Sequence, residues 1–128
     1  SKIEVDEETK KRESAARQII FWSLPEILII TLKRFSDHTN KNQCLVDFPL
    51  ENLDLTKYVV GYNKKSYIYD LYGICNHSGG LLGGHYTSSV KNIDGNWYNF
   101  NDQQVSKINN IEQLKTSKAY CFFYRKKK

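Results

Sequence analysis

The chain has 128 residues, of which 40% are hydrophobic and 26% charged, and this balance predicts one globular domain rather than a disordered protein. No stretch approaches the roughly 20 apolar residues that a membrane-spanning helix needs, so no membrane contact is expected. The formal net charge is +5, but the excess lies in the last four residues. It therefore predicts a solvated tail rather than nucleic-acid binding.

The three cysteines, Cys44, Cys75 and Cys121, are too widely spaced for a CxxC pair or a disulfide framework. This usage favours a reducing compartment, so we expect the cytoplasm or the nucleus. Cys75 and Cys121 lie in apolar stretches and are interpreted as buried small hydrophobes. The chain begins at Ser1, contains no Met and ends in three lysines, from which we expect a processed piece of a longer polypeptide.

The N-terminal part divides into a polar segment and two predicted strands. Residues 1–17 are rich in Glu, Lys and Arg, which predicts a short exposed helix or a frayed lead-in, and the domain itself is expected at 18–128. Bulky apolar residues at 19–22 and 27–32 predict strands. The second is so rich in isoleucine that we expect it to be buried on both faces, at the centre of a sheet.

Further along the chain, alternating and aromatic segments predict more strands, separated by polar loops. The predicted elements are strands at 67–74, 86–91, 97–100 and 119–124, a polar loop at 36–43, a short extended piece with a turn at 47–55, and a helical turn or two at 110–116. The fold class is therefore α+β, with a mostly antiparallel β-sheet and little helix.

The dipeptide Asp94-Gly95 is a strong hairpin signal, and it predicts that the strands at 86–91 and 97–100 pair antiparallel. His85 directly precedes the first of these strands, and the polar pair Asn101-Asp102 directly follows the second. The hairpin should therefore bring His85 within reach of both side chains.

An imidazole beside an Asn or Asp is the base-and-orienter half of a cysteine nucleophile site, because a thiol needs a base to take its proton and the base needs a group to hold it. Taken alone, His85 is more often a structural histidine. A metal site made of Cys75, His77 and His85 is a further reading, but their spacing matches no zinc ligand set, so no metal is expected.

Three blocks of sequence occur in order. They are Leu24-Pro25 through Lys33-Arg34-Phe35, then Tyr69 through Gly84-His85-Tyr86, then Trp97 through Asn101-Asp102 with the closing strand at 119–124. Together they resemble the C-terminal half of the ubiquitin-specific protease family, which are papain-like deubiquitinating cysteine proteases. The resemblance implies the palm and fingers half of that fold.

By this resemblance, His85 is the general base for a cysteine thiol and Asn101 orients its ring. An Asn fixes the tautomer by hydrogen bonding but stabilises the imidazolium less than a carboxylate does. Asp102 is the candidate for supplying that charge or for holding a water. Asn101 ranks above Asp102 because it directly follows Phe100, as the third catalytic residue of the family does.

The glycine-rich loop resembles the family's second blocking loop, over the channel that takes the C-terminal tail of ubiquitin. A tail ending in Gly-Gly passes where larger side chains would clash, and glycines in the loop let the two backbones approach. The residues implied in tail binding are His77, Gly79, Gly80, Leu81, Leu82, Gly83, Gly84 and Tyr86. Ubiquitin or ubiquitinated proteins are thus the expected partners, and no cofactor is expected.

The chain departs from the family in two ways. The family's nucleophile lies in an N-terminal box of Gly, Asn, Cys and Phe that nothing here resembles, and the zinc-binding CxxC pairs of many members are absent. We therefore expect the chain to be inactive alone and to work with a missing N-terminal half of the catalytic domain. A non-catalytic ubiquitin-binding or scaffold module is the alternative, a basic nucleic-acid module is a weaker one, and self-association of exposed sheet is a further expectation.

Overall fold

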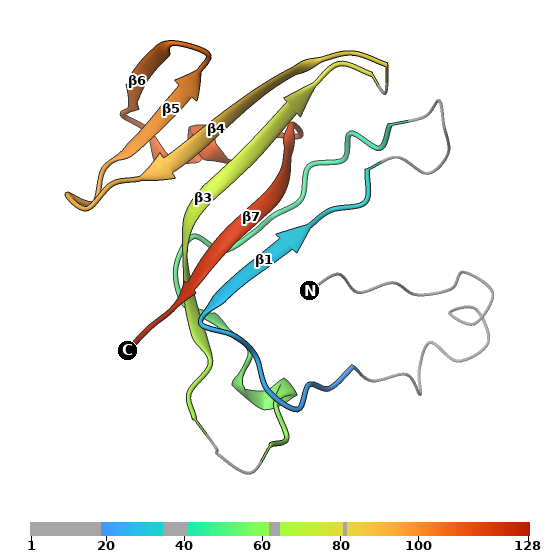
Figure 1. The fold of residues 1–128 in the computed structure, drawn as a ribbon, viewed down its shortest axis with the longest axis vertical. Helices are drawn as coiled ribbons and strands as arrows, with labels where there is room; N and C mark the ends of the chain where they lie inside the picture. The colour runs from blue at the N-terminus through green and yellow to red at the C-terminus, as the bar shows by residue number, and fades with distance from the viewer. Residues whose placement is uncertain (1–18, 35–40, 62–64, 81) are drawn as a thin grey trace.

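In the computed structural model, residues 19–34, 41–61, 65–80 and 82–128 are described. The predicted lead-in at 1–17 and most of the predicted loop at 36–43 lie outside these ranges. One twisted antiparallel sheet dominates the molecule, and Figure 1 shows its strands running side by side. Within the described residues, no helix is long and apolar enough to cross a membrane.

The strands of the sheet are β1 Ile27–Thr31, β2 Leu53–Asp54, β3 Ile68–Ser78, β4 His85–Lys91, β5 Trp97–Asn101, β6 Gln104–Ile108 and β7 Ala119–Lys126. Two single 3₁₀ turns, η1 Thr56–Tyr58 and η2 Ile111–Leu114, complete the regular structure. The strand order is β1-β7-β3-β4-β5-β6, with β2 paired to β3. The predicted fold class, a mostly antiparallel sheet with little helix, is confirmed.

The turn between β4 and β5 forms where the Asp94-Gly95 dipeptide predicts it. The amide of Asn92 donates to the carbonyl of Asn96, and the amide of Gly95 donates back to the carbonyl of Asn92. Gly95 has a φ of +87°, a conformation that costs glycine little. The register that follows pairs Lys91 with Trp97.

The prediction that the isoleucine-rich strand is central and buried on both faces is wrong. β1 is an edge strand, and Ile27 and Ile29 are 39% and 46% exposed, whereas Leu28 between them is 4% exposed. Side chains alternate between the two faces of a strand, so only one face of β1 meets the core. Isoleucine here reflects the preference of β-branched side chains for a strand.

Two other strands differ from expectation. Only Phe21 of the predicted strand at 19–22 pairs, in an isolated parallel bridge with Val59. Conversely, β6 is a strand that the sequence analysis did not predict, because four of its five residues are exposed and its polar composition resembles a loop. A two-residue turn brings it back against β5, with Asn101 paired to Gln104.

The core lies along a row of side chains that three strands share. Leu28, Tyr124 and Leu71 are register partners on β1, β7 and β3, and each is at most 4% exposed. Phe48, in the segment before β2, packs its ring 4.5 Å from that of Phe122. This packing fixes β3, and β4, whose first residue is His85, pairs with β3 on the side away from β7.

Candidate active site

The structure brings His85 and Asn101 together. His85 is the first residue of β4 and Asn101 the last of β5. Because Ser88 pairs with Phe100, the two side chains stand diagonally on one face of the sheet, where long side chains meet. The Nε2 atom of His85 lies 2.6 Å from Oδ1 of Asn101. The predicted proximity of His85 to Asn101 is therefore confirmed.

This contact selects one tautomer of the imidazole. The Asn101 Oδ1 atom only accepts hydrogen bonds, so the Nε2 atom of His85 carries the hydrogen and donates it. The Nδ1 atom then keeps its lone pair. Since His85 is exposed, the pair presents a basic ring nitrogen at the surface, held in a fixed orientation by an amide.

Asp102 is placed differently. It opens the two-residue turn between β5 and β6 with a φ of +53°, which Asp tolerates better than most residues. Its side chain is exposed and makes no hydrogen bond with any residue of the described ranges. The geometry thus gives Asp102 a part in the turn and joins His85 to Asn101.

The glycines of the loop fall into two kinds. A Cβ added to Gly79 would lie 2.8 Å from the Cα of Gly84, and one added to Gly84 would lie 2.3 Å from Nε2 of His77. At Gly80 and Gly83 an added Cβ would meet nothing within 4 Å. The first two are therefore required by close packing within the loop and against the end of β3, whereas the other two border open space.

Two leucines were also predicted in this loop. Leu82 is fully exposed. Leu81 lies outside the described residues.

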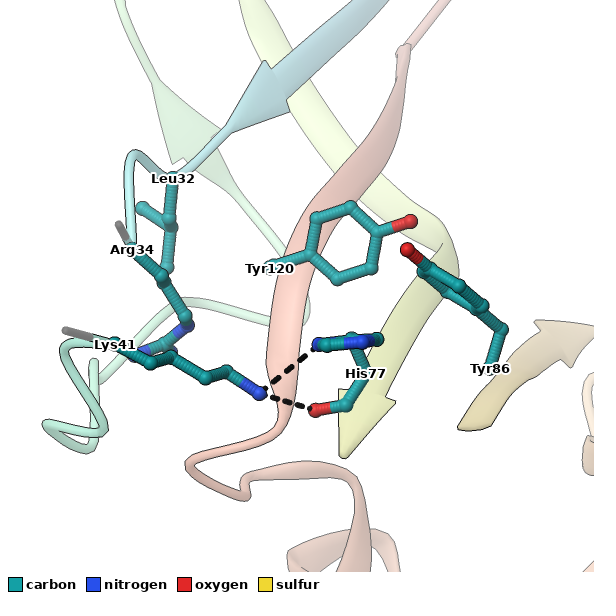
Figure 2. Close-up of a pocket in the computed structure, with 6 residues that line it drawn as sticks. All are labelled: Leu32, Arg34, Lys41, His77, Tyr86 and Tyr120. Atoms are coloured by element: carbon teal, nitrogen blue, oxygen red, sulfur yellow. Dashed lines mark hydrogen bonds between the residues drawn. The ribbon is translucent and has the colours of Figure 1, made fainter. Parts of the chain in front are cut away.

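Beside this loop lies a pocket of about 190 Å³, shown in Figure 2. It is lined by Leu32, Arg34, Lys41, His77, Tyr86 and Tyr120. His77 is 7% exposed, and its ring packs 4.6 Å from that of Tyr86, centroid to centroid. Burial first, and then the charge of Lys41, lower the pKa of His77. Two residues predicted to bind a ubiquitin tail thus line one pocket.

Arg34 and Lys41 are pocket residues that the sequence analysis did not single out. Arg34 is 5% exposed, and its Nε and Nη2 atoms donate to the carbonyl of Ala119 at 2.9 and 2.7 Å. Its Nη1 atom donates to the carbonyls of Asn42 and Cys44. In the sequence analysis, Arg34 was named only within the first of the three family-like blocks, and it was given no role of its own.

Metal binding has no support in this geometry. No group of three His, Cys, Asp or Glu side chains in the described part of the chain is arranged to hold an ion. The metal alternative used Cys75, and both Cys75 and Cys121 were expected to be buried hydrophobes. They are half-buried register partners on β3 and β7.

Comparison with known proteins gives the family. The model of the family described as ubiquitin carboxyl-terminal hydrolase matches residues 2–124. Ubiquitin carboxyl-terminal hydrolase 9 of Arabidopsis thaliana is 47% identical over 121 residues, which are 91% of this chain and 13% of that protein. Ubiquitin carboxyl-terminal hydrolase 4 of Pongo abelii is 38% identical over 122 residues, 92% of this chain and 13% of that protein.

Solved structures similar to this chain come from the same family. The SAGA DUB module of Ubp8, Sgf11, Sus1 and Sgf73 bound to monoubiquitin superposes with a TM-score of 0.70 at 34% identity, covering 82% of this chain and 24% of the matched one. The mostly antiparallel sheet is consistent with part of a papain-like cysteine protease fold. The chain belongs to the ubiquitin carboxyl-terminal hydrolase family and corresponds to the C-terminal part of the catalytic domain. It spans about 13% of the length of these curated relatives.

Proposed function

We propose that the chain is part of a deubiquitinating thiol protease and supplies the general base and its orienting residue to a cysteine carried by polypeptide outside these 128 residues. The observation that carries the proposal is the 2.6 Å contact between His85 Nε2 and Asn101 Oδ1, which leaves Nδ1 with a lone pair. The family match of residues 2–124 supports the reaction class.

The chemistry follows from this tautomer. Nδ1 of His85 takes the proton of the thiol, and the thiolate attacks the carbonyl carbon of the last glycine of ubiquitin. The imidazolium then returns the proton to the leaving amine, and water attacks the acyl-enzyme with the same ring as base. Asn101 keeps the ring of His85 in one orientation while the ring gains and loses a proton. In this scheme Asp102 supplies a nearby negative charge or a water and makes no direct contact with the ring.

For the ubiquitin tail we propose the channel between the glycine loop and the aromatic pocket. Gly80 and Gly83 have open space where a side chain would begin, which allows a Gly-Gly tail to pass close to the backbone. His77 and Tyr86 form the wall of this channel, and the exposed Leu82 closes over the tail. The match to a DUB module bound to monoubiquitin supports the same partner.

A chimera tests the catalytic assignment. The chain replaces its matched 121-residue segment in the Arabidopsis relative, and hydrolysis of a ubiquitin fluorogenic amide is measured. We expect an active chimera, and His85→Ala should lower kcat/KM by about 10³-fold or more, as is usual when a member of such a triad is removed. Undiminished activity of that variant would refute the role of His85.

A matched pair of variants separates the two candidates for orienter. Asn101→Ala removes the acceptor of the Nε2–H bond, so we expect a loss of about 10-fold to 10³-fold, mainly in kcat. Asp102→Asn keeps the turn and removes only the charge, and it should change kcat/KM less than about 10-fold. A larger loss from Asp102→Asn than from Asn101→Ala would reverse the ranking.

The second candidate is a non-catalytic module that binds ubiquitin, which is favoured by the lack of a family-like cysteine box in the chain. An inactive chimera that still binds ubiquitin would support this candidate against the first. We place either function in the cytoplasm or nucleus, on the grounds of the unpaired cysteines.

A further inference from the structure

Lys41 occupies the place where the ladder between β3 and β7 ends. The amide of His77 donates to the carbonyl of Lys118 at 2.9 Å, and the amide and carbonyl of one residue in an antiparallel strand point to the same side. β7 begins only at Ala119, and the amide of Lys118, which would donate back to His77 in a continued ladder, donates instead to Oγ1 of Thr116 at 3.2 Å. The carbonyl of His77 therefore faces a position that the neighbouring strand has already left.

The ammonium of Lys41 fills that position. Its Nζ atom donates to the carbonyl of His77 at 2.9 Å and to that of Gly79 at 3.4 Å, and it lies 3.1 Å from Nδ1 of His77. Figure 2 shows the side chain reaching across to the ring and the carbonyl of His77. The three N–H groups of the ammonium thus have three acceptors. At the carbonyl of His77 the lysine replaces the amide that a neighbouring strand would supply.

The residues that Lys41 contacts pack against Gly84, the residue before His85. Gly79, which Lys41 holds, packs against Gly84, and Gly84 packs against the ring of His77, which Lys41 also holds. Gly84 is the residue before His85. Protein interiors pack too closely for one partner to shift alone, so movement of the His77 ring would displace the backbone that enters β4.

The ammonium of Lys41 does not form an ion pair with any described residue. No carboxylate of the described residues pairs with Lys41, and burial together with the charges of Arg34 and Lys118 lowers its pKa. Acceptance by Nδ1 of His77 also requires a neutral ring that is protonated at Nε2. Lys41 contacts two backbone carbonyls and one ring nitrogen. These contacts fix the position of the His77 ring and of the backbone at Gly79.

We propose that Lys41 is a positioning residue, which closes the open edge of β3 and so holds the loop that carries the backbone into His85. The relevance to catalysis rests on the proposed function, whereas the anchoring is a property of this chain alone.

The test is an NMR measurement on the 128-residue chain, which requires no activity. Long-range ¹⁵N–¹H spectra report the tautomer and the pKa of His77, and amide exchange reports the opening of the loop from Gly79 to Gly84. Lys41→Met removes the donors and keeps the apolar stem, Lys41→Arg restores donors, and Lys118→Met removes a nearby charge whose side chain makes no hydrogen bond with described residues.

In the unchanged chain we expect His77 to carry its proton on Nε2. In Lys41→Met the pKa of His77 should rise and the loop amides should exchange about 10-fold faster or more, since hydrogen bonds from a charged donor are lost. Lys41→Arg should recover part of this protection, and Lys118→Met should leave exchange within about 2-fold of the unchanged chain.

Equal exchange in Lys41→Met and Lys118→Met overturns the inference and leaves the role of His85 intact. If Lys41→Met fails to fold, the tautomer in the unchanged chain decides: a His77 ring protonated at Nδ1 overturns the inference, and one protonated at Nε2 supports it. An inactive chimera would instead count against the proposed function and leave this result standing.

Discussion

Gly84→Ala tests whether the glycine loop is held by its own packing. The added methyl would lie 2.3 Å from Nε2 of His77 and 2.5 Å from the carbonyl oxygen of Ser78. Both distances are far inside van der Waals contact, and the second atom belongs to the backbone of β3. Overpacking of this kind costs about 1–3 kcal/mol, and two such contacts place Gly84→Ala at about 3 kcal/mol.

The matched control is its neighbour. Gly83→Ala places a methyl in open space, so it should be neutral or stabilise the fold by up to about 1 kcal/mol through the unfolded chain. In a chain of this size, a loss of about 3 kcal/mol lowers Tm by roughly 10 °C. Urea and thermal unfolding followed by fluorescence report it, because Trp97 is buried on β5. Free energies of unfolding that agree within about 0.5 kcal/mol for the two variants would refute the packing account.

Three further predictions concern other parts of the sheet. Arg34→Met should lower the free energy of unfolding by about 3 kcal/mol in urea titrations, because it leaves buried carbonyls without donors; a loss below about 1 kcal/mol would contradict this. Burial raises the pKa of Tyr124 from 10 to about 12, so the unfolded state ionises first and stability should fall as the pH rises from about 10 to about 12. Tyr124→Phe should flatten this alkaline limb, and an unchanged limb would assign the loss to other groups. A maleimide should label the exposed Cys44 before Cys75, which is less accessible and whose pKa is raised by burial, and mass mapping that finds Cys75 first would contradict the burial pattern.

Much of the sheet was predictable because its signals are local. Asp94-Gly95 identifies a turn without knowledge of the rest of the fold, and the flanking strands then place His85 near Asn101. The predicted position of β1 was wrong because a run of isoleucines shows that a segment prefers to be a strand but does not show how many of its faces are covered. That depends on neighbours distant in sequence.

Lys41 and Arg34 were missed for a related reason. Each acts on backbone carbonyls of segments far along the chain: Lys41 on the end of β3, and Arg34 on Ala119 at the start of β7. A lysine or arginine in a polar loop is usually solvated, and nothing in the local sequence distinguishes one that serves as a donor to another strand. Composition cannot reveal the open edge of a strand, which exists only once the neighbouring strand has stopped.

The separation between His85 and Asn101 is only 16 residues, across a single reversal of the chain. Contacts of such short range form early in folding and depend little on distant segments. The two residues that we propose as base and orienter therefore form one local unit of the chain, and their alignment with a cysteine would depend on polypeptide outside this hairpin.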